Sequence, residues 1–331
     1  MRKLVLALLA GGALASSAVL AAPVALPGNT PLFLQYVNAE QISLSNSISD
    51  PSGGPSMGNW GIVQITDIAA GTVLAPTGSD IQGGGTTIFH DNLLPAGAQI
   101  LGMFYGADFG ASATGAIATG GKLDLYYWDP GHTLQNTGTE LASGTNLAKR
   151  TATNEYTGYT CASGNTSQCT LLAEFDFVSG SDPGAPGVTI VTPTVPGTTD
   201  GTSKSYLSVD TTKVGAWTSI LDTNFFTLDP CNNPVGHTYA AGGEPCISGT
   251  VGPGINPGYV GGVSYPDATD IRLDNNFSRS GATAWDVAGT DIIGLRSNDP
   301  ARAFTVPEPE SVALLGLTLA IGGWFGRRRQ K

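Results

Sequence analysis

Charged side chains are scarce in this sequence, and basic ones are the scarcest. They make up 12% of the 331 residues, with 15 Lys and Arg against 26 Asp and Glu. Six of the basic residues lie in the first three or the last five positions, so residues 4–326 carry nine basic and 26 acidic residues, a net charge of −17. A surface of that sign repels nucleic acids and anionic lipids. We therefore expect no nucleic-acid partner, and we attribute the charge to solubility, with divalent cation binding as the alternative.

Histidine is nearly absent, which limits the chemistry that the chain can perform. The three histidines are His90, His132 and His237. Asp91 follows His90 and could orient its imidazole, but no G-x-S-x-G segment supplies a nucleophile. The sequence also has no H-E-x-x-H segment and no phosphate-binding glycine motif. We therefore predict no catalytic residue, no metal site and no cofactor, and we expect a non-enzymatic protein.

Paired carboxylates keep one catalytic alternative open. Asp124, Asp129, Glu174 and Asp176 lie on or near expected strands, and two suitably spaced carboxyl groups can hydrolyse a glycosidic bond. Acidic residues that alternate along a strand more often form its solvated face. A glycan hydrolase is therefore a remote alternative.

Helix-forming periodicity is also missing from the body of the chain. Gly and Pro together account for 67 residues, about a fifth of the chain, and they favour turns between short strands. Alternating apolar residues predict a series of strands: Leu32–Val37, Trp60–Ile65, Gln99–Gly106, Lys122–Asp129, Ala173–Phe177, Tyr206–Val209, Ile271–Leu273 and Trp285–Val287. Half-buried antiparallel strands of this kind pack as two sheets. We therefore predict an all-β, antiparallel β-sandwich-like ectodomain over residues 22–305; whether Pro193–Ser203 divides it into two domains stays open.

The N-terminus has the order of a secretory signal peptide. Arg2 and Lys3 precede an apolar stretch, and small residues follow it. Cleavage after Ala21 is the first choice, because Val19 and Ala21 suit the −3 and −1 positions, and cleavage after Ala22 is the second. Residues 1–21 are therefore predicted to form a cleavable signal helix, with the export machinery and signal peptidase as partners.

The C-terminus, residues 306–331, is built like a stop-transfer segment. Val312–Gly326 carries no charge and as a helix would span ~22 Å, short of a ~30 Å hydrocarbon core. A basic cluster of Arg327, Arg328 and Arg329 follows and should stay cytoplasmic. Pro307 and Pro309 oppose helix formation, so the segment around Glu308 should be extended just outside the membrane. We therefore predict a short C-terminal transmembrane helix that holds the protein in the inner membrane transiently.

Pro307-Glu308-Pro309, the apolar helix and the basic cluster together resemble the PEP-CTERM sorting signal in order, spacing and location. The resemblance implies recognition by exosortase, a membrane-embedded processing enzyme of Gram-negative bacteria that make extracellular polysaccharide. It implies export, inner-membrane anchoring before processing, and then a cell-surface or extracellular location. It covers about 25 residues and implies no activity for the body.

Cysteine is rare but even in number. Cys161 and Cys169 are eight residues apart, and Cys231 and Cys246 are fifteen apart. An even count behind an export signal indicates disulfides, and the nearest-neighbour pairing is the most economical of the three pairings. The spacings contain no CxxC, which argues against zinc.

Aromatic side chains leave one binding hypothesis. Tyr126, Trp128, Trp217 and Trp285 could stack on sugar rings, with Trp128 and Trp217 as the candidates, although core packing is the simpler explanation. We therefore expect a non-enzymatic surface or matrix component associated with exopolysaccharide or biofilm. The alternative is a polysaccharide-binding module.

Overall fold

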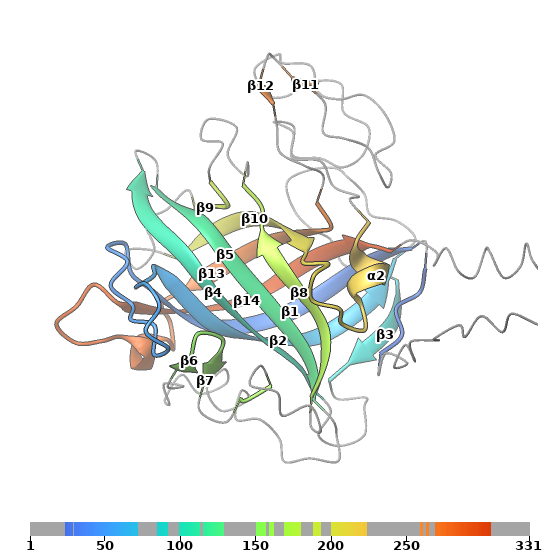
Figure 1. The fold of residues 1–331 in the computed structure, drawn as a ribbon, viewed down its shortest axis with the longest axis horizontal. Helices are drawn as coiled ribbons and strands as arrows, with labels where there is room; N and C mark the ends of the chain where they lie inside the picture. Colours follow the sequence, from blue (N-terminus) through green and yellow to red (C-terminus); the bar gives the residue numbers. More distant parts are fainter. Residues whose placement is uncertain are drawn as a thin grey trace, which may run out of the picture.

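Long antiparallel strands form most of the structure. The computed structural model describes residues 24–28, 30–71, 85–91, 99–112, 115–128, 150–156, 159–161, 169–179, 188–192, 200–223, 259–260, 263–264 and 269–305. A ten-stranded antiparallel sheet dominates them (Figure 1). Its strands are β1 (Pro31–Ile42), β2 (Asn59–Ala70), β3 (Thr86–His90), β4 (Gln99–Ser112), β5 (Gly115–Trp128), β8 (Cys169–Phe177), β9 (Ile190–Thr192), β10 (Gly201–Val209), β13 (Ile271–Ser278) and β14 (Ile293–Phe304).

The sheet closes on itself. Eight strands follow one another in the order β1, β14, β13, β10, β8, β5, β4 and β2, and β2 pairs again with β1. The short strand β9 pairs with both β5 and β10, and β3 pairs with the C-terminal part of β2. Figure 1 shows β5 and β8 crossing in front of β1 and β14, which lie on the opposite side of the closed sheet. An interior of eight strands is just wide enough to be filled by side chains or to hold one small ligand.

The prediction of an all-β, antiparallel fold is confirmed, but the prediction of two packed sheets is corrected. The strands form one closed sheet, so the inward residues face the opposite wall of the same sheet. The alternation of apolar and polar residues reveals a buried face in either arrangement. The alternation does not reveal which strands pair. It could not show that the first strand, β1, pairs both with β2 and with the last strand, β14.

Six of the eight predicted strands fall within observed strands, a seventh, Lys122–Asp129, matches β5 up to Trp128, and the last one does not match a strand. Trp285 ends a 3₁₀ turn, η1 (Thr283–Trp285), and the final strand is β14. The segment Ser297–Pro300 inside β14 has the composition of a turn, which hid this strand from the sequence pattern. Two short hairpins form separate two-stranded sheets: β6 (Arg150–Ala152) with β7 (Glu155–Tyr156), and β11 (Tyr259–Val260) with β12 (Val263–Ser264).

Helix is limited to short turns in the part of the chain that the structure describes. These are α2 (Thr218–Leu221) and η1. No helix among the described residues is long and apolar enough to cross a membrane. The predicted signal helix and the predicted C-terminal helix both lie outside the described residues.

Apolar side chains gather at both ends of the interior. One cluster contains Leu34, Val63 and Leu125, and Trp217 beside α2 belongs to it. A second, smaller cluster contains Ile42 and Phe277. Both are built from inward positions of the same strands, because side chains of a strand alternate between its two faces. What lies between the two clusters decides what the interior can bind.

The outer face of the sheet carries a further core. Trp60 on β2 lies against Trp285 of η1, with ring centroids 5.6 Å apart, and the stacked rings of Tyr156 and Tyr159 are fully buried beside them. Burial of large aromatic rings against the outer face of a sheet fixes the segments that carry them to that sheet. The loops that cover this face therefore stabilise the closed sheet from outside.

Candidate functional site

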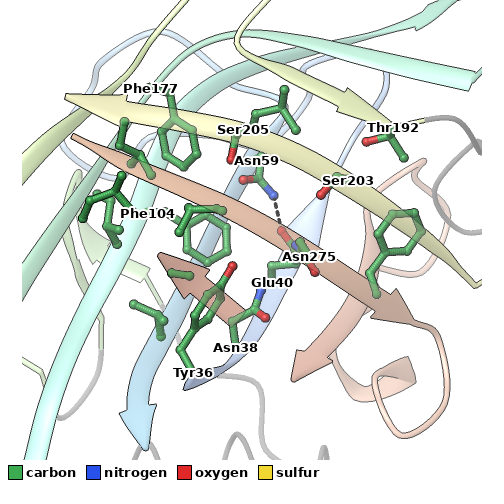
Figure 2. A pocket seen from close by; sticks show the side chains of 18 of the residues that line it. Tyr36, Asn38, Glu40, Asn59, Phe104, Phe177, Thr192, Ser203, Ser205 and Asn275 are labelled. Carbon is green, nitrogen blue, oxygen red and sulfur yellow. Dashed lines mark hydrogen bonds between the residues drawn. The ribbon is translucent and has the colours of Figure 1, made fainter. Parts of the chain in front are cut away.

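A belt of polar side chains lies inside the closed sheet, between the two apolar clusters. We call the following six residues the polar belt: Asn38 and Glu40 from β1, Asn59 from β2, Ser203 and Ser205 from β10, and Asn275 from β13. Figure 2 shows these side chains gathered in the interior. They are part of the lining of a cavity of about 80 Å³.

The belt follows from the register of the strands. Along β1 the inward positions run from Leu34 and Tyr36 through the belt residues to Ile42, so the polar pair interrupts an otherwise apolar face. Ser203 on β10 lies directly opposite Asn275 on β13. The inward positions of β13 show the same succession, with Asn275 between Leu273 and Phe277. Asn59 at the start of β2 and the two serines of β10 add to this polar zone of the interior.

The remaining lining of the cavity is apolar and partly aromatic. Phe104, Phe177 and Leu273 line the cavity, yet they are only half-buried. Inward-facing apolar side chains in a close-packed interior would be fully covered. The interior is therefore not completely filled by its own side chains at this level.

Hydrogen bonds satisfy only part of the belt. Asn59 Nδ2 donates to Glu40 Oε2 at 2.8 Å, the bond drawn in Figure 2, and to the Gln41 carbonyl oxygen at 3.0 Å. The side-chain oxygens Oδ1 of Asn38 and Asn275 are buried and accept no hydrogen bond from any described group. Buried polar atoms without partners are rare, because each costs about 1–3 kcal/mol.

Glu40 carries the only carboxyl group among the described residues that line the cavity. It is 5% exposed, and burial raises its pKa to about 7, although hydrogen bonds from Asn59 and Asn38 act in the opposite direction. None of the lining residues that the structure describes is basic. Close to neutral pH, Glu40 therefore exchanges a proton easily, and its ionised form meets no cation of the protein within the cavity.

A second acidic group lies beside the belt on β14. Asp299 is fully buried, and burial raises its pKa to about 8, with Glu40 and Asp274 adding to the shift. Its Oδ1 accepts a hydrogen bond from the backbone amide of Asn276. Tyr36, at the apolar edge of the belt, also has a raised pKa because of burial and of the nearby acidic groups. The interior thus presents acceptors and acidic groups on an apolar, aromatic background.

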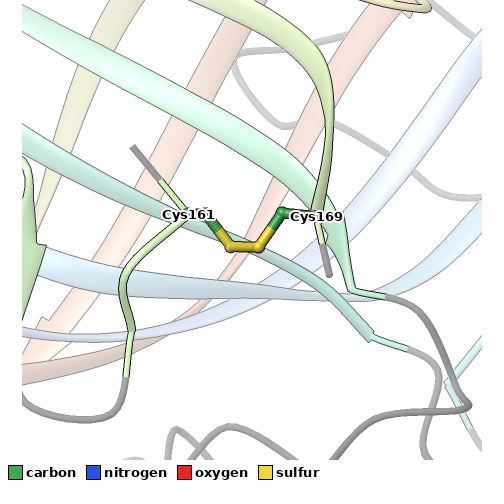
Figure 3. Close-up of a disulfide and its surroundings, with 2 residues drawn as sticks. All are labelled: Cys161 and Cys169. Carbon is green, nitrogen blue, oxygen red and sulfur yellow. A yellow bond between two sulfur atoms is a disulfide. The ribbon is translucent and has the colours of Figure 1, made fainter. Parts of the chain in front are cut away.

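The predicted disulfide between Cys161 and Cys169 is present. The two sulfur atoms are 2.00 Å apart, and the bond joins Cys161, which follows Tyr159 on the outer face, to Cys169 at the start of β8 (Figure 3). Closing a loop of this size stabilises a fold by ~2.5 kcal/mol in the chain-entropy model. Cys231 and Cys246 lie outside the described residues, so their pairing stays a prediction.

The two tryptophans predicted to stack on sugars are buried instead. Trp128 is 3% exposed and packs in the outer core, and Trp217 is fully buried with its Nε1 donating to the Val24 carbonyl oxygen at 2.8 Å. Neither ring presents a face to a glycan at the surface. Both rings serve packing, which was the simpler of the two explanations for them.

The acidic residues on β5 and β8 do not form the solvated face that their alternation suggested. Asp124 and Glu174 lie opposite each other on the two strands and are both buried, while Asp176 is exposed. Asn154 Nδ2 donates to Asp124 at 2.8 Å, and Lys122 Nζ lies 3.0 Å from Glu174. Burial raises the pKa of Asp124 to about 6. Its carboxyl group attaches the β6–β7 hairpin to the outer face of the sheet.

The remaining predicted sites lie outside the described residues. They are the cleavage residues Ala21 and Ala22, the processing motif Pro307, Glu308 and Pro309, and the basic cluster Arg327–Arg329. Asp129 also lies outside them.

Comparison with known proteins identifies the C-terminal segment. Residues 305–330 match the family described as the PEP-CTERM protein-sorting motif. This motif marks an exported protein that exosortase processes, with a cell-surface or extracellular fate. No curated protein and no solved structure matches the chain.

The polar belt was not predicted from the sequence, although β1 contained a signal for it. Asn38 and Glu40 have the same parity as Leu34 and Tyr36, so in a strand they must share the buried face. Two polar residues in phase with an apolar face indicate a buried polar site. The residues that complete the belt come from strands that only the closed pairing brings together.

Proposed function

We propose that this chain is an exported, non-enzymatic component of the cell surface or extracellular matrix of a Gram-negative bacterium, associated with exopolysaccharide or biofilm. The observation that carries the proposal is the sorting motif at residues 305–330. Before processing, the C-terminal helix anchors the protein in the inner membrane. After processing, the closed sheet is displayed outside that membrane.

The contacts of the ionisable residues support a non-enzymatic body. His90 Nδ1 lies 3.1 Å from Asp67 and 3.2 Å from Asp91, and Lys122 is surrounded by three carboxylates at 2.9–3.4 Å. In each cluster, carboxylates engage the basic group at the edge or the outer face of the sheet. Among the described residues, no three His, Cys, Asp or Glu side chains are placed to hold a metal ion.

The two alternatives from the sequence receive less support. A polysaccharide-binding module would need exposed aromatic rings, and Trp128 and Trp217 are buried. A glycan hydrolase would need two accessible carboxyl groups, whereas Asp124 is 1% exposed and held by Tyr105 and Asn154. The matrix-component function depends on neither requirement.

Fractionation of cells that do and do not make extracellular polysaccharide tests this function. We expect the wild-type chain in the matrix fraction of producing cells and in the culture medium of an otherwise identical strain without the polysaccharide. A chain that ends at Thr305 serves as the control that is exported but not sorted. An equal distribution of the wild-type protein in both strains would contradict the association with polysaccharide.

A further inference from the structure

The cavity inside the closed sheet has the chemistry of a binding site for a cation. Among the described side chains that line it, Glu40 is the only one that carries a charge near neutral pH, because the pKa of Tyr36 is raised, and that charge is negative. The unpartnered Oδ1 atoms of Asn38 and Asn275 add two buried acceptors at the same level. Asn38 is 2% exposed and lines the cavity, so the unmet acceptor faces the interior. Three groups that accept hydrogen bonds converge where the protein supplies too few donors.

Aromatic rings in the cavity also favour an organic cation. Tyr36, Phe104 and Phe177 line the same cavity as Glu40, and Figure 2 shows them around the belt. An ammonium group is attracted by the faces of aromatic rings, and the attraction grows when both partners are removed from water. A metal ion would need several oxygen ligands in a fixed shell, and it would leave the half-buried apolar side chains uncovered.

We propose that this interior binds a small organic amine, with its ammonium group in the polar belt and its apolar part against Phe104, Phe177 and Leu273. The ammonium group donates to Glu40 and to the free oxygens of Asn38 and Asn275. The apolar part covers side chains that are otherwise only half-buried. The cavity of about 80 Å³ favours a ligand with one ring or a short alkyl chain.

Binding of an ammonium group should depend on the protonation of the interior. Among the described residues, the titratable groups near Glu40 are Tyr36, which lines the cavity on the same strand, and Asp299 on β14, which lies beside the cavity. Asp274 on β13 adds negative charge near both of them. The other described lining residues, on β2, β4, β5, β8, β9, β10, β13 and β14, do not titrate. The pKa of Glu40, about 7, means that the carboxylate forms as the pH rises from 6 to 8. An amine that stays protonated in this range should therefore bind more tightly at pH 8 than at pH 6, by about tenfold.

Benzylamine and benzyl alcohol provide a matched pair of probes, because they differ in charge and scarcely in size. Isothermal titration of the mature protein at pH 8 should show benzylamine binding at least tenfold more tightly than benzyl alcohol. Glu40→Gln should reduce benzylamine affinity at least tenfold and leave the weak affinity for benzyl alcohol unchanged. Asp108→Asn removes an exposed carboxylate from β4 and should change neither affinity.

Asn275→Leu provides a second test that does not alter charge, with Asn276→Leu as its exposed neighbour on the same strand. The first should weaken benzylamine binding several-fold, and the second should not. If benzylamine fails to bind, binds no better than benzyl alcohol, or binds equally to Glu40→Gln and wild type, the proposal is wrong. The comparison of the two probes on the wild type decides the matter even if a variant does not fold. Sorting to the matrix is measured separately, so its outcome does not affect this result.

Discussion

Replacing Glu308 by Ala should stop removal of the C-terminal segment without affecting export. Because Pro307 and Pro309 oppose helix formation, we expect an extended motif that can lie in a protease groove and present Glu308. A carboxylate in this position can form charge-assisted hydrogen bonds with a cationic pocket. The apolar segment and the basic cluster that set its depth in the membrane are unchanged. We therefore expect the variant to retain its tail, to migrate as a larger protein and to stay in the inner-membrane fraction.

Two control variants separate recognition from anchoring. Glu310→Ala removes a carboxylate two residues away and should be processed like the wild type. Replacing Arg327–Arg329 by Gln should disturb topology instead, because the positive charges hold the tail on the cytoplasmic side. Gel mobility and membrane fractionation in a host that contains the enzyme measure all three. Normal processing of the Glu308 variant would show that the motif is incidental.

Glu40→Gln should make the protein markedly more stable at alkaline pH. The pKa of Glu40 is about 7 in the folded protein because of burial, whereas the ordinary pKa of a glutamate carboxyl group is 4.5. A raised pKa contributes stability that is complete below pH ~4 and is lost as the pH rises through about 7. The amide cannot ionise, and its oxygen can still accept the bond from Asn59. The variant should therefore gain roughly 3 kcal/mol at pH 9 but less than about 1 kcal/mol at pH 5.

Thermal unfolding measured from pH 4 to pH 9 checks this difference. We expect the melting temperature of the wild type to fall between pH 5 and pH 9, since Asp299, with a pKa of about 8, acts in the same direction. Glu40→Gln should melt about 5–10 °C higher than wild type at pH 9. Asp108→Asn, the exposed control, should follow the wild type. A parallel pH profile for Glu40→Gln and wild type would show that Glu40 is not buried as described.

At acidic pH we expect the opposite trend, with stability falling as the pH falls. The protein should therefore have a pH of maximum stability. Hydrogen bonds from Ser47, Ser45 and Ser43 hold the pKa of Asp291 well below its usual range. A lowered pKa contributes stability that is present above pH ~4 and is lost as the pH falls further. The wild type should therefore be most stable in mildly acidic solution.

Local sequence patterns predicted the strands well, but they did not predict how the strands close. Leu32–Val37 alternates visibly, and it is found within β1. The pairing of β1 with β14 joins the two ends of the body, and no local pattern encodes a contact over that distance. The same limit applies to the polar belt. Glu40 could be assigned to a buried face from its parity, but its neighbours Ser203 and Asn275 arrive through long-range register.

The sequence favoured packing for its aromatic residues, but it did not show where each ring packs. Trp217 follows Gly215 and Ala216 in a segment between strands, and it is fully buried in the apolar cluster. Its indole N–H donates a hydrogen bond to the backbone carbonyl of Val24, which is 193 residues away in the chain. By contrast, the sorting motif was readable because its function depends on linear order rather than on folding.

The most direct test of the account is the C-terminal sequence of the mature wild-type protein, determined by mass spectrometry from hosts with and without exosortase. With the enzyme, we expect an extracellular or surface-bound chain that lacks Val312–Lys331. Without the enzyme, we expect an intact chain that ends at Lys331 and remains in the inner-membrane fraction. Recovery of the same intact chain, in the same fraction, from both hosts would contradict the conclusion that this protein is an exosortase substrate.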